Sequence, residues 1–194
     1  MEVSNNMQKS NDKQGQANHH AIEFGCSESV LRVLALLLTL TAAILLGLDK
    51  QTKIVPLQLS PSLPPFYLPA VAKYTYVSAY VYFVAANSIA CAFAAISLVI
   101  ACTNKGGGKQ SFLRMMIIVA DLVMVALLFS SIGAATSIGI VGLKGNSHLQ
   151  WKKVCDLFGK FCHQVMASVA LSLLGAIAFF LLLIISVSKL QKRN

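Results

Sequence analysis

The sequence predicts an all-α membrane protein: a bundle of four transmembrane helices with both termini on the same side of the bilayer, which we expect to be the cytosol. Three observations predict it. Of the 194 residues, 56% are apolar and only 12% are charged, about half the charged share of a soluble domain. Four apolar stretches are long enough to cross the roughly 30 Å hydrocarbon core. The basic residues behind the net charge of +9 lie mostly outside these stretches, which fits the flanks of membrane helices and excludes a nucleic-acid surface.

The first half of the chain contains two predicted spans. Residues 1–29 form a polar tail that cannot bury enough apolar surface to fold alone. The first span covers 30–48, and the loop at 49–73 holds all five prolines, so we expect an irregular or extended loop. The second span covers 74–102, and tyrosines gather near its start, as they do at the headgroup level of membranes.

The second half of the chain is organised in the same way. A short glycine-rich connector at 103–111 leads to a third span at 112–141. A loop with two cysteines at 142–164 leads to a fourth span at 165–187, and a basic tail covers 188–194. No predicted span contains proline, so we expect each helix to run unbroken.

The charges leave the orientation of the bundle nearly open. The two sides hold almost equal numbers of Lys and Arg, so the positive-inside rule barely discriminates between them. Basic residues are packed closely at helix ends in the middle connector and after the fourth span, while Cys155 and Cys162 share a loop on the other side, where an oxidising compartment would suit them. Both observations favour cytosolic termini, and they make 49–73 and 142–164 extracellular loops.

Arg32 and Asp121 are the most informative residues, because they place one base and one acid inside apolar spans. An ionised group there costs at least about 2.5–3.5 kcal/mol, and such groups usually pair within the bundle. By the predicted boundaries Asp121 lies about 10 Å deeper than Arg32, a gap that the long arginine side chain and a small boundary error would close. We therefore predict an intramembrane ion pair that ties the first span to the third. Two alternatives stay open: Arg32 snorkels to the headgroups, and Asp121 is protonated or bonded to a Ser, a Tyr or Asn87 of another helix.

No set of residues points to catalysis. The spans lack a second acid, and the chain lacks a metal-ligand cluster, a Ser/His/Asp arrangement and a C-x-x-C motif. We therefore expect no enzymatic activity, no metal and no cofactor. Transport sites usually need several polar groups on broken helices, so we favour a structural role for the ion pair. A small transporter or channel subunit that uses Asp121 and Arg32 is the alternative.

Small residues recur at every fourth position in three spans, a spacing that lets helix backbones approach closely. They are Ala86, Ala90 and Ala94; Ser131, Ala135 and Gly139; and Ser168, Ser172 and Ala176. We favour packing within the bundle, and a stripe that faces another subunit is the alternative.

Several of these residues carry a resemblance to a known family. They are Arg32 in the first span, Asp121 in the third, the stretch 82–87 of the second span, and Trp151, Cys155, Phe158, Phe161 and Cys162 in the last loop. In this pattern the chain resembles the Casparian strip membrane domain protein (CASP) family of plants, in particular its CASP-like branch, subfamily 1. The resemblance covers all four spans.

The resemblance implies a non-enzymatic plasma-membrane scaffold with cytosolic termini. Its implied partners are the lipid bilayer and related four-span proteins, with which it would form homo- and hetero-oligomers that organise membrane domains or partner proteins. True Casparian strip members guide lignin deposition in the wall, but their first-loop signature is absent from 49–73. The resemblance therefore extends to the CASP-like branch and not to the Casparian strip itself.

Within the last loop we expect a disulfide between Cys155 and Cys162. On a continuous helix two residues seven apart are separated by about 10.5 Å, and a disulfide needs Cα atoms within about 7 Å. A bridge therefore requires a turn, which Gly159 would supply. Two buried thiols are the alternative.

Overall fold

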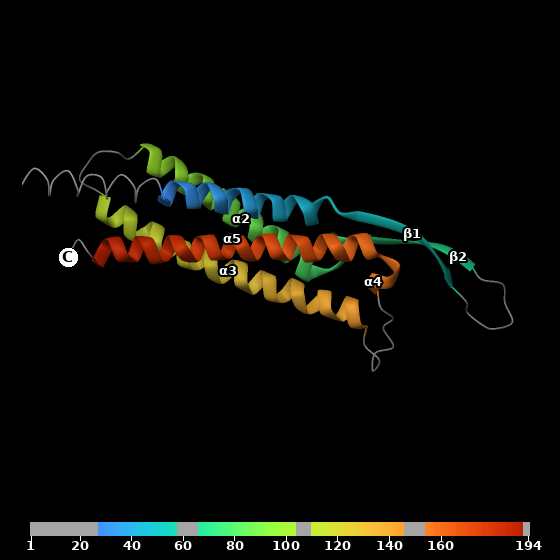
Figure 1. The fold of residues 1–194 in the computed structure, drawn as a ribbon. Coiled ribbons are helices and arrows are strands. Elements are labelled where there is room, and N and C mark those ends of the chain that lie inside the picture. The colour runs from blue at the N-terminus through green and yellow to red at the C-terminus, as the bar shows by residue number, and fades with distance from the viewer. Residues whose placement is uncertain (1–26, 58–65, 104–109, 146–153, 192–194) are drawn as a thin grey trace, which may run out of the picture.

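Four long helices form an elongated bundle in the computed structural model, which describes residues 27–57, 66–103, 110–145 and 154–191 (Figure 1). They are an N-terminal helix at Ser27–Gly47, α2 at Ser78–Thr103, α3 at Gln110–Lys144 and α5 at Gly159–Gln191. Each is long and apolar enough to cross a membrane. The predicted four-span bundle is thereby confirmed.

The helices continue beyond the apolar stretches that the sequence marks. The first is already helical at Ser27, three residues before the predicted span, and α5 begins at Gly159 rather than at residue 165. At 1.5 Å per residue, α3 is about 50 Å long, so it exceeds the hydrocarbon core by several turns. Hydropathy locates the apolar part of a helix, whereas the helix itself extends into the polar headgroup region.

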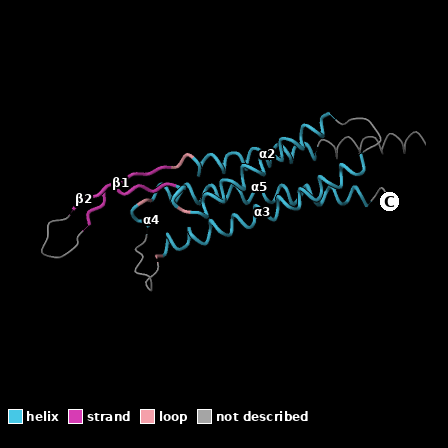
Figure 2. The backbone as a smooth tube through the Cα atoms, turned by 180° about the vertical axis from the view of Figure 1, so that it is seen from behind, coloured by secondary structure: helices cyan, strands magenta, loops and turns pink. Residues whose placement is uncertain are grey.

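The bundle has two distinct ends. The N-terminal helix begins, and α5 stops, at one end (Figure 1), where Lys189 and Glu28 form an ion pair at 2.8 Å. We call this the tail end. The N-terminal helix ends, and α5 begins, at the opposite end, from which a β-hairpin projects (Figures 1 and 2). We call this the hairpin end.

The proline-rich segment after the first helix contains a regular β-hairpin, which the sequence analysis did not predict. Strand β1 at Lys50–Leu57 pairs antiparallel with β2 at Phe66–Lys73. Pro56 lies opposite Tyr67, and Pro69 lies opposite Ile54. Both prolines fall in the same alternate set of pairs, where the backbone N–H groups point away from the partner strand. A proline there removes no hydrogen bond from the ladder, so this part of the loop is extended and regular rather than irregular.

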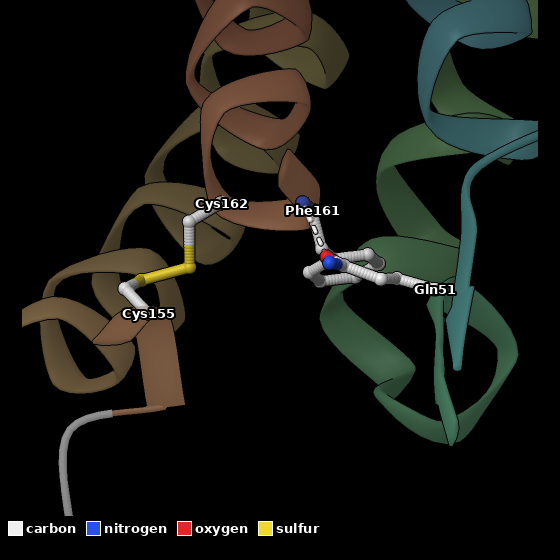
Figure 3. Close-up of a disulfide and its surroundings, with 4 residues drawn as sticks. All are labelled: Gln51, Cys155, Phe161 and Cys162. Atoms are coloured by element: carbon white, nitrogen blue, oxygen red, sulfur yellow. Dashed lines mark hydrogen bonds between the residues drawn. A yellow bond between two sulfur atoms is a disulfide. The ribbon is translucent and has the colours of Figure 1, made fainter. Parts of the chain in front are cut away.

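The base of the hairpin is anchored to the bundle. An isolated two-stranded hairpin is only marginally stable in water. Here the backbone N–H of Phe161 donates a hydrogen bond to Gln51 Oε1 at 3.1 Å (Figure 3). Ala72 and Tyr74 pack on the apolar cluster at this end of the bundle, which includes Phe161. The hairpin is therefore an outward extension of the helical core.

The core consists of small and aromatic residues, and the large aliphatic side chains face outward. Eight of the nine small residues singled out in the sequence are buried, and Gly139 is half-buried. Leu122, Ile96 and Leu174 are each more than half exposed. A soluble protein rarely exposes so much contiguous apolar surface. The outer surface therefore fits lipid, and the small residues pack within the bundle.

Candidate functional site

Three polar residues from three helices lie at one level near the tail end. Arg32 of the N-terminal helix, Ser97 near the end of α2 and Asp121 of α3 are joined by hydrogen bonds. The depth difference of about 10 Å expected from the sequence therefore does not keep Arg32 and Asp121 apart.

The structure brings Arg32 and Asp121 into contact. Arg32 Nη2 lies 3.2 Å from Asp121 Oδ2 and Nη1 lies 3.4 Å from Oδ1, so the guanidinium contacts both carboxylate oxygens in the two-pronged arrangement typical of arginine. Arg32 Nη1 also donates to Ser97 Oγ at 2.7 Å. Arg32 is 6% exposed and Asp121 is fully buried. The arginine therefore points into the bundle rather than toward the headgroups.

A second ion pair lies one helical turn closer to the tail end. Glu28 precedes Arg32 by four residues on the same helix, and its carboxylate contacts Lys189 of α5. The charges therefore alternate from the surface inward as Lys189, Glu28, Arg32 and Asp121. Such an arrangement leaves no net charge to be stabilised in the membrane.

A neutral polar contact lies deeper in the bundle. Ser172 Oγ donates to Asn87 Oδ1 at 2.9 Å, and Asn87 Nδ2 donates to the carbonyl of Phe83. Asn87 therefore binds α5, and it does not serve Asp121, as one of the sequence-based alternatives allowed. Every buried side-chain nitrogen and oxygen among the described residues has a hydrogen-bond partner.

These two polar contacts link helices through the buried interior of the bundle. The close backbone contacts run from α2 to α3 and from α3 to α5, and Gly175 of α5 lies against Thr39 of the N-terminal helix. Arg32 to Asp121 connects the N-terminal helix to α3, and Asn87 to Ser172 connects α2 to α5. The two contacts therefore act as cross-braces through the centre of the bundle.

The predicted cysteine pair lies at the hairpin end. Cys155, in the short helix α4 at Val154–Leu157, is bonded to Cys162 in the first turns of α5, and their Cα atoms are 5.6 Å apart (Figure 3). The chain leaves the helical path at Phe158 and resumes at Gly159, so the turn that the spacing required is present. Trp151, the remaining predicted residue of this loop, lies outside the described residues.

The two phenylalanines of this loop segment are buried beside the disulfide. Phe158 and Phe161 are each 7% exposed, and the ring of Phe161 meets that of Tyr80 edge-on, with centroids 5.9 Å apart. The segment between the two cysteines therefore packs on α2 through its aromatic side chains and binds the hairpin through its backbone.

A buried carboxylate completes this end of the bundle. Asp49 is 7% exposed, and burial raises the pKa of its carboxyl group. With its amide turned to satisfy both groups, Gln164 Nε2 donates to Asp49 Oδ1 and Oδ2 at 2.5 and 3.1 Å. Asp49 and Gln51 therefore both bind the start of α5. The sequence did not single them out, because Asp and Gln are common in exposed loops.

The contacts of both regions join parts of the chain that are distant in sequence. Among the described residues, no three His, Cys, Asp or Glu side chains lie close enough to hold a metal ion. A shallow hollow at the start of α5 is lined by Gly159, Lys160, His163 and Gln164. The ion pair, the amide bridge and the disulfide each join separate segments of the chain.

Comparison with known proteins gives a consistent picture. The Casparian strip membrane protein domain matches residues 23–178. A protein of Vitis vinifera called CASP-like protein 1E2 is 56% identical over 165 residues, which cover 85% of this chain and 84% of the relative. CASP-like protein 1E1 of Arabidopsis thaliana is 52% identical over 163 residues, with 84% and 85% covered. No solved structure matches the chain.

Proposed function

The chain belongs to the Casparian strip membrane protein family, and from this premise we propose that it is a non-enzymatic scaffold of the plasma membrane. In this proposal it self-associates and organises related four-span proteins into a membrane domain. Its termini face the cytosol, and its hairpin and disulfide face the cell exterior. The observation that carries the proposal is the braced interior, in which side chains from all four helices bind one another.

The contacts in the interior of the bundle favour a rigid protein over one that conducts ions or substrates. A transport site needs polar groups that can exchange partners with an ion or a proton. Here Asp121 is fully buried and bound by Arg32, and Asn87 is bound by Ser172. Since every described buried polar side chain already has a partner, none is left to receive a substrate.

The outer surface of α3 supports self-association. Only 22% of the most apolar stretch of α3 is buried, against 39% of that of α5. The exposed part of α3 carries small and hydroxyl-bearing residues, namely Ser130, Gly133, Thr136 and Ser137. An added Cβ at Gly133 would meet no atom within 4 Å. Small residues facing lipid let a second helix approach closely, so we propose this face as the contact between copies.

Gly133→Leu tests this proposal, because it adds a large side chain to the exposed face of α3, where it meets no atom of the same copy. We expect the wild-type protein to cross-link as oligomers in membranes and to diffuse slowly in the cell, as measured by photobleaching recovery. The Gly133→Leu protein should be folded, less cross-linked and more mobile. A wild-type protein that is monomeric and freely mobile would contradict the scaffold.

A further inference from the structure

Each of the four long helices has a lysine at its hairpin end (Figure 1). Lys144 is the last residue of α3, and Lys160 is the second residue of α5. Lys50 follows the end of the N-terminal helix by three residues, and Lys73 directly precedes the short 3-10 helix at Tyr74–Tyr76 that leads into α2. Lys73 is half-buried, and the other three are exposed. We call these four residues the end lysines.

The chain itself offers little negative charge to offset the end lysines. Segments 49–73 and 142–164 contain seven lysines and only two acids, Asp49 and Asp156. Asp49 is buried and bound to Gln164. Within the parts of the chain that the structure describes, no end lysine forms an ion pair. Their charge is therefore left for a partner outside the chain.

The tail end is built differently. There Lys189 pairs with Glu28, and Arg32, one turn deeper, pairs with Asp121. The protein thus neutralises described basic side chains internally at one end of the bundle and leaves the end lysines unneutralised at the other.

Two of the end lysines also repel each other. Lys50 and Lys73 lie directly opposite one another in the register of β1 and β2, and like charges at such positions are destabilising. An external anion that binds between the two ammonium groups would remove this repulsion.

The apolar surface beside the end lysines indicates the kind of anion. Leu48, Tyr76 and Leu143 are 80%, 72% and 49% exposed, and each lies within three residues of an end lysine. Exposed leucines of a spanning protein face acyl chains, and tyrosines gather at the headgroup level. The end lysines therefore lie at the boundary between acyl chains and water, where lysine stems cover apolar surface and the ammonium groups reach the headgroups. Lipid phosphates form one layer at this level and reach all four helices, whereas a soluble polymer would first have to displace them.

From this arrangement we infer that the hairpin end binds anionic phospholipids, with headgroup phosphates beside the end lysines and between Lys50 and Lys73. The attraction is electrostatic, so salt screens it. The inference goes beyond the proposed function, because it assigns a lipid preference to one end of a single copy. It depends neither on self-association nor on which side of the membrane the hairpin end faces.

Spin-labelled lipids test the inference on the full chain in phosphatidylcholine vesicles. Electron paramagnetic resonance gives the association of labelled phosphatidylglycerol with the protein surface relative to that of labelled phosphatidylcholine. The hairpin-end variant is Lys50→Gln/Lys73→Gln/Lys144→Gln/Lys160→Gln. The control variant, Lys105→Gln/Lys109→Gln/Lys192→Gln/Arg193→Gln, removes the same charge from the connector at 103–111 and the C-terminal tail. We expect the wild type to prefer phosphatidylglycerol by about threefold or more at low salt, the hairpin-end variant to lose most of this preference, and the control variant to keep it.

Two further measurements separate lost charge from lost folding. The thermal stability of the hairpin-end variant in phosphatidylcholine should equal or exceed that of the wild type, because the repulsion between Lys50 and Lys73 is gone. Replacing the same four lysines by arginine keeps the charge and should keep the preference.

Three results would overturn the inference. One is a wild type without preference, or an unchanged preference in the hairpin-end variant. Another is an equal loss in both Gln variants, which would assign the preference to basic residues at membrane surfaces in general. The third is binding of polyglutamate that requires the end lysines while the lipid preference does not, since the lysines would then serve a soluble acidic partner. Labelled lipid is present in both leaflets, so the orientation of the protein in the vesicle does not affect the outcome.

Discussion

Arg32 and Asp121 connect the N-terminal helix to α3. Removing two charges from water is costly, and their attraction offsets this cost only with good geometry and further hydrogen bonds. Here the guanidinium contacts both carboxylate oxygens and Ser97 Oγ. Losing one partner leaves the other buried and unpaired, at a cost of about 3–5 kcal/mol. Each residue is therefore tolerated in the membrane because of the other.

Charge reversal tests this dependence. Asp121→Lys places two cations side by side, so we expect little folded protein after extraction, measured by size-exclusion chromatography. Adding Arg32→Asp restores opposite charges across the same helices and should recover a large part of the folded fraction. A double variant that assembles as poorly as Asp121→Lys alone would show that the pair does not hold the helices together.

Asp49 gives the protein a pH-dependent contribution to stability. Burial raises the pKa of its carboxyl group above 3.8, so the folded state holds this proton more tightly than the unfolded state does. The stabilising contribution is present below pH 3.8 and is lost as the pH rises through the raised pKa. We expect the melting temperature of Asp49→Asn relative to wild type to increase as the pH rises from below 3.8 through the raised pKa of Asp49. A difference that is constant over this range would contradict the prediction.

At the scale of the elements, close approach between helices depends on particular small residues. A Cβ added at Gly175 would lie 3.1 Å from Thr39 Cγ2 and 3.6 Å from Leu38 Cβ. The contact between α5 and the N-terminal helix therefore needs glycine at this position. The same reasoning does not apply to every glycine, because Gly133 faces open space.

Replacing Gly175 and Gly133 by the same residue shows whether the position of a glycine, and not the loss of glycine itself, decides the change in stability. We expect Gly175→Val to force α5 away from the N-terminal helix and to destabilise the bundle by about 1–3 kcal/mol, as overpacked cores do. Gly133→Val serves as the control and should change the stability of a single copy by less than about 0.5 kcal/mol. Unfolding in mixed detergent measures both. An equal loss of stability in both variants would show that the close contact between α5 and the N-terminal helix does not require glycine at position 175.

The disulfide connects elements beyond the two cysteines. In the loop-closure relation, a ring of this size stabilises by roughly 2 kcal/mol. We expect Cys155→Ser/Cys162→Ser to increase hydrogen exchange in α4, at the start of α5 and in β1, because Phe161 binds Gln51. Cys91→Ser, which removes a free thiol from α2, should leave exchange in these segments unchanged. Faster exchange confined to α4 would show that the hairpin does not depend on the bridge.

At the scale of the whole molecule, the sequence predicted the features that a membrane makes obligatory. Four apolar runs can only be spans, and a lone acid and a lone base within them need partners. Ser97 and the contact of Asn87 with Ser172 escaped prediction, because neutral polar residues carry little cost and offer many possible partners. The hairpin escaped because prolines usually interrupt strands, and only the register shows that Pro56 and Pro69 avoid the ladder. Orientation stays a prediction, since Lys and Arg are distributed almost evenly between the two sides.

In the proposed scaffold the buried charges are fixed braces and not a path for ions. Proton and potassium flux into proteoliposomes that contain the purified protein separates the two possibilities. We predict the same flux as in empty liposomes, both for the wild-type protein and for Asp121→Asn. Flux above that background in the wild type, abolished by Asp121→Asn in correctly folded protein, would contradict the claim and identify a small transporter or channel.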